Sequence, residues 1–126
     1  MGVFFYSRRL YDLAIDEFAR ALRYLPESAT VHYNMGGALF GKGRLAEAEA
    51  EFRAALALDP GHLEAGYFLG LTMRERGRPA EALQEMERVW RACPQDPFHR
   101  LRREAREQIA ILRDQLGSVW VGEGGR

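Results

Sequence analysis

The sequence predicts an all-α fold made of stacked antiparallel helix hairpins. Three observations lead to this prediction: a repeat with a period of 34 residues, apolar side chains at helical spacing within it, and glycines and prolines at its boundaries. The shift of 34 residues aligns Gly2, Gly36 and Gly70; Ala14, Ala48 and Ala82; Phe18, Phe52 and Met86; Ala21, Ala55 and Val89; and Pro26, Pro60 and Pro94. Agreement in this many columns indicates that the repeat is real.

Residues 1–28 carry only the later columns of a repeat, which predicts a shortened first hairpin whose first helix begins about two turns late. The alternative is that the chain is a fragment of a longer array, or that Met1 was placed inside one. In both cases the apolar residues 3–6 lack an upstream neighbour, and exposed apolar surface of this kind often marks an association site. The alternative function is therefore a self-assembling structural module, a homo-oligomer formed through this open N-terminal edge and the tail.

Residues 29–62 and 63–96 form two complete repeats. Helical periodicity predicts first helices at 30–41 and 63–76, and second helices at about 45–58 and 79–92. Gly43 and Gly77 mark the end of each first helix, because glycine adopts a left-handed conformation at little cost. Pro79 suits a first helical turn, and the prolines of the 34-residue period stop each second helix.

Residues 97–116 depart from the repeat and predict one amphipathic helix with a densely charged outer face. Its apolar face contains Phe98, Leu101, Ala105, Ile109, Leu112 and Leu116. We interpret it as a capping helix, which a stack of repeats needs to stay soluble. The arginines between Arg100 and Arg106 could instead bind an anion or nucleic acid, but the interleaved glutamates favour a solvated face. Residues 117–126 contain four glycines and predict a flexible tail, in which Trp120 either packs on the capping helix or docks into a groove.

Length and composition fit a single domain over residues 1–116. The 126 residues include 18 basic and 18 acidic side chains, so no attraction of the whole domain for nucleic acid or an anionic membrane is expected. The single cysteine, Cys93, excludes an internal disulfide framework and is expected to be a half-buried structural thiol. No apolar stretch is long enough for membrane insertion, and we expect a cytoplasmic protein. Lys42 is the only lysine, a bias that suits a GC-rich, bacterial genome.

This pattern resembles the tetratricopeptide repeat family over about residues 1–96. Residues 29–62 match best, through Met35-Gly36, Gly43, Ala48, Phe52, Ala55 and Pro60. Residues 63–96 match through Leu69-Gly70, Gly77, Ala82 and Pro94, with Met86 in place of the phenylalanine. His32 and Gly66 occupy the column in which the family usually has tryptophan, a departure that weakens local packing. The resemblance implies a right-handed superhelical solenoid. Its concave surface, lined by the first helix of each repeat, receives an extended peptide or a partner helix.

The family's inward-facing columns, carried onto this chain, give the candidate binding residues. They are Thr30, Tyr33, Asn34, Gly37, Phe40 and Gly41 in one repeat; Glu64, Tyr67, Phe68, Leu71, Arg74 and Glu75 in the next; and Val3, Tyr6 and Ser7 in the shortened one. The family's asparagine that matches Asn34 hydrogen-bonds the backbone of a bound peptide; the alternative is that Asn34 only braces adjacent helices. The aromatic residues Tyr33, Tyr67 and Phe68 either give a partner flat apolar contact area or pack between helices.

A carboxylate clamp, as found in the chaperone-binding branch of the family, is not expected. Of its residues only Asn34 is present, and Glu64 and Phe68 occupy its expected basic positions. The groove is therefore expected to suit an apolar or amphipathic segment of a protein or peptide partner. The three histidines are far apart, and the chain contains no catalytic motif or metal-ligand pair, so we expect neither an enzyme nor a metal or cofactor site.

Overall fold

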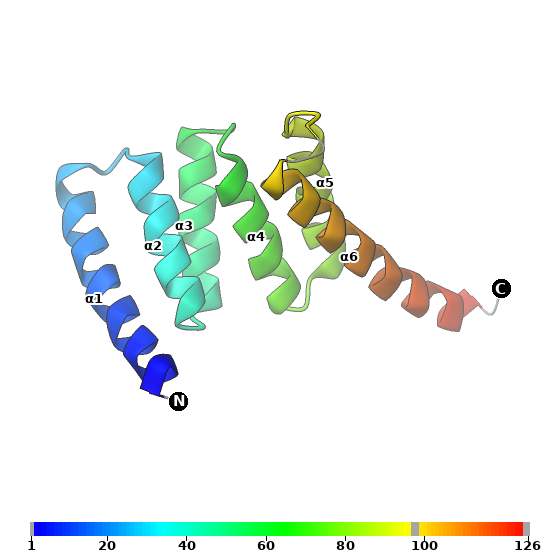
Figure 1. Ribbon diagram of the computed structural model, residues 1–126, viewed down its shortest axis with the longest axis horizontal. Coiled ribbons are helices and arrows are strands. Elements are labelled where there is room, and N and C mark those ends of the chain that lie inside the picture. Colours follow the sequence, from blue (N-terminus) through cyan, green and yellow to red (C-terminus); the bar gives the residue numbers. More distant parts are fainter. Residues whose placement is uncertain (1, 97–98, 125–126) are drawn as a thin grey trace.

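The structure is an all-α array, as the sequence predicts. The computed structural model describes the backbone of residues 2–96 and 99–124 and the side-chain surroundings of residues 9–96 and 99–117. In this part of the chain the elements are α1 (Gly2–Tyr24), α2 (Ala29–Gly41), α3 (Leu45–Leu58), α4 (Leu63–Glu75), α5 (Pro79–Ala92) and α6 (Arg100–Gly124). Figure 1 shows them following one another along the long axis of the molecule, with the end of α6 extending beyond the stack. No helix among the described residues has the length and apolarity needed to cross a bilayer.

Helices α2 to α5 form the two predicted hairpins, with boundaries within a residue of those expected. Gly43 and Gly77 have positive φ angles of 81° and 76°, which confirms that they end α2 and α4. After Gly43, the Arg44 N–H donates to the Leu39 carbonyl at 2.9 Å; after Gly77, Arg78 repeats this bond. Each hairpin therefore turns through the same hydrogen-bonded glycine motif, and α2 with α4 and α3 with α5 occupy equivalent places.

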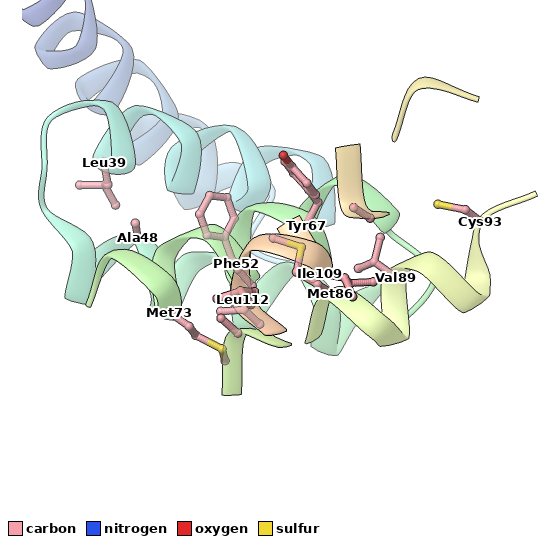
Figure 2. Packing of buried hydrophobic residues seen from close by; sticks show 13 residues of the cluster. Leu39, Ala48, Phe52, Tyr67, Met73, Met86, Val89, Cys93, Ile109 and Leu112 are labelled. Carbon is pink, nitrogen blue, oxygen red and sulfur yellow. The ribbon is translucent and has the colours of Figure 1, made fainter. Parts of the chain in front are cut away.

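We call the first helices of the hairpins, α2 and α4, together with α6, the inner helices, and the second helices, α3 and α5, the outer helices. The core lies where each inner helix meets its outer helix and the next hairpin. Ala48, Phe52, Ala82 and Met86, which belong to repeated columns, are fully buried, and Figure 2 shows that Phe52 and Met86 lie inside the same cluster. A Cβ atom at Gly36 would lie only 2.7 Å from the Phe52 ring, so the glycine allows α2 and α3 to approach closely. The small and large columns of the repeat therefore have the packing roles that the sequence predicts.

Helix α1 differs from the expected shortened hairpin, because Gly2–Tyr24 is one continuous helix. In the 34-residue period the counterpart of Gly43 and Gly77 is Arg9. Without a glycine that takes a positive φ angle, nothing ends a first helix at this point, and the chain continues as a single helix. The predicted exposure of Val3, Phe4, Phe5 and Tyr6 concerns side chains outside the described residues.

Helix α6 was expected over 97–116 and instead extends from Arg100 to Gly124. Most of the predicted flexible tail is thus helical, since glycine weakens a helix by about 1 kcal/mol relative to alanine but keeps its hydrogen-bond donor. The predicted apolar face is confirmed at Ala105, Ile109 and Leu112, which are buried against the core. Phe98 and Trp120, with its proposed docking, are outside the part whose side chains are described.

The face of α6 that corresponds to the α5-packing face of α4 carries charged side chains. The side chains of His62 and His99 cap α4 and α6 in the same way, accepting from the N–H three residues later at 3.1 and 3.2 Å. Aligned on these caps, Arg106 and Glu107 take the places of Leu69 and Gly70, and both are exposed. Charged side chains therefore stand where α4 packs closely on α5, which gives α6 the polar surface that a capping helix needs.

Candidate functional site

A cleft of about 370 Å³ opens between the N-terminal halves of the inner helices α4 and α6. Its lining residues are Glu64, Tyr67, Phe68, His99, Arg100, Leu101 and Glu104. The cleft is hollowed from side chains of two successive inner helices. It therefore lies on the surface that the sequence analysis assigned to a partner, although only part of the predicted set lines it.

The apolar part of the cleft consists of Tyr67, Phe68 and Leu101. The rings of Tyr67 and Phe68 meet edge to face, with their centroids 5.5 Å apart, a geometry that favours aromatic pairs. Tyr67 is only 8% exposed, whereas Phe68 and Leu101 are half-buried. A ligand in the cleft would therefore contact the edges of rings that the core already holds in place.

The rim of the cleft is charged. The exposed Glu64 lies on α4, and on α6 the Arg100 guanidinium donates to Glu104 at 3.0 Å. Burial, followed by the negative charges of Glu104 and Glu107, raises the pKa of Tyr67, so its hydroxyl keeps its proton at neutral pH. The cleft thus combines an aromatic floor with charged groups at its rim.

The aromatic residues predicted to line the groove pack mainly against one another. Phe68 is the centre of this cluster: its ring centroid lies 6.1 Å from those of Tyr33 and Phe52 and 6.2 Å from that of Phe40. Burial, with the charge of Glu64 second, raises the pKa of Tyr33. Of the two roles left open by the sequence, packing between helices is observed, since these side chains join α2, α3 and α4; Tyr67 and Phe68 also border the cleft.

The remaining predicted residues lie on α2 and α4, outside the lining of the cleft. Thr30 is exposed, and a Cβ atom at Gly37 would have no neighbour within 4 Å, so this part of α2 is open. Asn34 is half-buried, and its amide forms no hydrogen bond with any described residue. Arg74 donates to Gln108 of α6 at 2.8 Å, so its guanidinium is engaged within the fold.

Three further candidates on these helices have other surroundings. Leu71 is half-buried against the core, and Glu75 is exposed. A Cβ atom at Gly41 would clash with the Tyr11 ring, which places this glycine at the contact of α2 with α1. The side chains of Val3, Tyr6 and Ser7 belong to the part of the chain whose surroundings are not described.

Sequence reasoning missed the contribution of α6 to the cleft, namely His99, Leu101 and Glu104. Residues of α6 were assigned to a capping role, with anion or nucleic-acid binding by the arginines as the alternative, because the repeat pattern stops after Pro94. The available signal was the histidine before each helix, since His62 and His99 both precede an inner helix by one residue. This shared histidine indicates that α6 is an inner helix, and Leu101 and Glu104 lie on the side of it that borders the cleft with α4.

The histidines and the cysteine have structural partners. His32 lies between Glu51 and the Pro26 carbonyl, and His62 and His99 cap helices. Cys93, expected to be half-buried, is only 3% exposed, and burial raises the pKa of its thiol, which keeps it protonated. Within the described ranges, no three His, Cys, Asp or Glu side chains are placed to hold a metal ion.

The fold and the repeat define a class of protein, helical-repeat arrays that present a surface of inner helices. Two family models, both described as tetratricopeptide repeat, match residues 3–62 and 39–105. The chain therefore belongs to the tetratricopeptide repeat family.

Curated relatives match the chain over part of their length. A peroxisomal targeting signal receptor of Candida albicans is 33% identical over 86 residues, which are 68% of this chain and 14% of the receptor. The small glutamine-rich tetratricopeptide repeat-containing protein 2 of Saccharomyces cerevisiae is 28% identical over 79 residues, covering 63% of this chain and 23% of that protein. The chain thus spans less than a quarter of either relative.

Solved structures share the superhelical fold at low sequence identity. The first repeat domain of Spaghetti (RPAP3), bound to an HSP90 peptide, has a TM-score of 0.78 at 23% identity and covers 90% of this chain and 85% of its own. The TPR2B domain of yeast Sti1, in a complex with pHsp70, has a TM-score of 0.79 at 18% identity, covering 88% and 89%. The Yersinia enterocolitica type III secretion translocator chaperone SycD has a TM-score of 0.82 at 13% identity, covering 92% and 82%.

Proposed function

We propose that this chain is a protein-interaction scaffold that binds a peptide or a partner helix in the cleft between α4 and α6 and along α2. The observation that carries the proposal is the cleft itself, where Tyr67, Phe68 and Leu101 offer apolar surface beside charged groups. Most ligand sites combine these two elements, apolar area for affinity and a few polar groups for orientation. The structural relatives that are bound to an HSP90 peptide and to pHsp70 support the same use of the fold.

Asn34 extends the proposed site along α2. Its amide can both donate to and accept from a peptide backbone, and no hydrogen bond within the described residues engages it. Gly37 lies three residues further on the same helix with open space around it. A segment seated over Phe68 would thus find a hydrogen-bonding side chain and an unobstructed backbone on the neighbouring inner helix.

The charges at the rim indicate the chemistry of the partner. Arg100 pairs with Glu104, but together with Glu64 the rim holds two carboxylates against one guanidinium, and this net negative charge would repel a terminal carboxylate and attract a basic side chain. The expected ligand is therefore an amphipathic segment, with an apolar side chain over the aromatic floor and a lysine or arginine next to it.

A random peptide library displayed on phage, selected against the wild-type protein, tests this function. Selected peptides should combine an apolar residue with a basic one. Glu64→Lys with Glu104→Lys should weaken their binding by about tenfold, and Asn34→Ala by about fivefold, the effect of one lost hydrogen bond. Affinities are measured by calorimetry, with thermal unfolding to verify the fold; Tyr67 is too buried to serve as a test position.

The matched control is Gln84→Ala, which removes an exposed amide from the outer helix α5. It should leave the affinity unchanged. If Asn34→Ala and the double lysine variant bind the selected peptides as tightly as Gln84→Ala does, the cleft and α2 are not the binding surface.

The second candidate function is self-assembly through the N-terminal edge. Leu10 and Leu13 on α1 are 44% and 56% exposed, and Tyr24 at the end of this helix is 82% exposed. Apolar side chains of this size on one helix are suited to pairing with α1 of a second copy. Light scattering over a range of concentrations should then show dimers that Leu10→Glu with Leu13→Glu converts to monomers; a wild-type protein that remains monomeric throughout would eliminate this function.

A further inference from the structure

A second hollow, of about 290 Å³, lies between α5 and α6. Its lining residues are Glu87, Trp90, Arg91, Arg106, Ile109 and Arg113. None of them lines the cleft between α4 and α6. This second hollow is therefore a separate one, with basic side chains around a tryptophan.

The preceding hairpin shows what kind of element fits beside such a hollow. An equivalent hollow borders α3, where Arg53, Leu56 and Ala57 correspond in the 34-residue period to Glu87, Trp90 and Arg91. There the next outer helix, α5, supplies a further wall through Glu85 and Arg88. Beside α6 no helix of the described residues takes that place. The geometry of the repeat thus favours a helix as the occupant.

The charge of the surface selects the kind of helix. Arg91 and Arg106 are exposed, and neither forms an ion pair with a described residue, whereas Arg113 donates to Glu87 at 2.8 Å. A smaller hollow adjoins through Arg106 and is lined by Arg102, Arg103, Arg106 and Glu107. The two hollows together carry five arginines and two glutamates. Guanidinium groups bind carboxylates in a bidentate manner, so the complementary surface is acidic.

Trp90 gives the surface an apolar centre. The half-buried Trp90 ring has the Arg102 guanidinium 4.3 Å above its centroid, and Arg102 also donates to the Trp90 carbonyl at 3.1 Å. Arg102 is thus fixed, while Arg91 and Arg106 stay available at the edge. Tryptophan and arginine are the side chains that most often dominate binding energy at interfaces. Glu107, in the place of a glycine, would keep a docked helix from close backbone contact, so binding would depend on these long side chains.

We propose that the surface formed by Trp90, Arg91, Arg106, Ile109 and Arg113, here called the arginine surface, binds an acidic amphipathic helix of a partner protein. Carboxylates of that helix pair with Arg91 and Arg106, beside the ion pair of Arg113 with Glu87, and its apolar side chains cover Trp90 and Ile109. This site is separate from the proposed peptide cleft and takes a ligand of the opposite charge.

The test uses a synthetic helical peptide with leucines on one face flanked by glutamates. It is titrated into the full chain carrying Trp120→Phe, in which Trp90 is the remaining tryptophan. We expect a saturable change in Trp90 fluorescence and no such change with the peptide whose glutamates are replaced by lysines. Arg91→Glu with Arg106→Glu should weaken binding by about tenfold or more.

The matched control is Arg9→Glu with Arg23→Glu, an equal change of charge at exposed positions on α1, which should leave the affinity unchanged. Asn34→Ala should leave it unchanged too, so that failure of this proposal and failure of the peptide cleft are distinguishable. The milder pair Arg91→Ala with Arg106→Ala must weaken binding in the same direction. The proposal is overturned if the acidic peptide does not saturate, if both charge reversals act alike, or if single-stranded DNA binds the same arginines as tightly as the peptide does.

Discussion

Gly36 and Gly70 occupy the same column of the repeat but lie against side chains of different stiffness. A Cβ atom at Gly36 would lie 2.7 Å from a ring carbon of Phe52, and one at Gly70 would lie 2.8 Å from the terminal methyl group of Met86. An aromatic ring in a filled core has no free direction in which to move, whereas a methionine side chain rotates about three bonds. Although the two calculated Cβ distances are nearly equal, we therefore expect Gly36 and Gly70 to tolerate alanine differently.

Gly36→Ala should lower the free energy of unfolding by about 1–3 kcal/mol, because the overpacked ring must move. Gly70→Ala should change it by less than about 0.5 kcal/mol, since Met86 can shift and alanine has the better helix propensity. Guanidinium denaturation of both variants measures the difference. Equal destabilisation by both would show that the ring and the thioether adapt equally well.

His32, in the column where the family usually has tryptophan, replaces an apolar contact by an ion pair. Its Nδ1 lies 2.7 Å from a Glu51 carboxylate oxygen and its Nε2 lies 2.9 Å from the Pro26 carbonyl oxygen. Burial by itself lowers the pKa of His32, but the hydrogen bonds to Glu51 and Pro26 and the charge of Glu51 outweigh it and raise the pKa above its ordinary value of 6.5. Both ring nitrogens face acceptors, so the protonated imidazole suits this site.

The stability of the protein should therefore decrease as the pH rises past neutrality. The folded pKa of His32 is the higher one, so its contribution is fully present below the unfolded pKa of about 6.5 and is lost as the pH rises through the folded pKa. The effect is expected to be below about 1 kcal/mol for a partly exposed pair. Urea denaturation between pH 6 and 8 measures it, and Glu51→Gln should flatten the dependence. An identical slope in Glu51→Gln would assign the effect to other groups.

At the scale of elements, α2 to α5 could be predicted from the sequence because each boundary carries its own chemical signal. Gly43 and Gly77 end the inner helices, and prolines follow the outer ones. The sequence did not predict that α1 is one continuous helix, since the repeat columns indicated a hairpin. The residue at the position of the helix-ending glycines, Arg9, does not end a helix. The extent of α6 was missed because glycines weaken a helix without terminating it.

The candidate site was predictable only where the repeat is regular. Tyr67 and Phe68, which the columns of the preceding repeat made candidates for a partner-binding groove, line the cleft. Helix α6 begins three residues later than the 34-residue period places it, counted from α4. Because of that offset, the sequence did not indicate that Leu101 and Glu104 line the cleft. Whether the aromatic residues pack between helices or face a partner stayed open in the sequence, since burial depends on neighbours from three helices.

Leu112 lies on the buried face of α6, and its neighbour Ile111 lies on the exposed face. Leu112 is fully buried and Ile111 is 43% exposed. Leu112→Ala should lower the free energy of unfolding by about 2–4 kcal/mol through the cavity it leaves, and Ile111→Ala by less than about 1 kcal/mol. Thermal or guanidinium unfolding compares them. If the two losses are equal, α6 is not docked on the core through the Ala105, Ile109 and Leu112 face.

For the whole molecule, the arrangement of helices predicts a gradient of local stability. Among the described residues α1 packs against α2 alone, whereas α3 packs against α2 and α4, and α4 packs against α2, α3, α5 and α6. Local opening follows the number of packed neighbours in repeat proteins. Hydrogen exchange followed by mass spectrometry should show the fastest amide exchange in α1 and the slowest in α3 and α4. Uniform protection of α1, α3 and α4 would instead indicate that the array opens only as one unit.

The charged pair Arg106 and Glu107, in the places of Leu69 and Gly70, has a consequence for how such an array could grow. A hairpin appended after α6 would meet two bulky charged side chains where close helix contact requires a small one. A 34-residue unit inserted between α5 and α6 would instead meet the outer helix α5 on one side and leave α6 in its terminal role. Lengthening by duplication, whether in evolution or by design, is thus directed to junctions before α6, and exchanging Arg106 and Glu107 for leucine and glycine is the change that would allow a further hairpin to pack after α6.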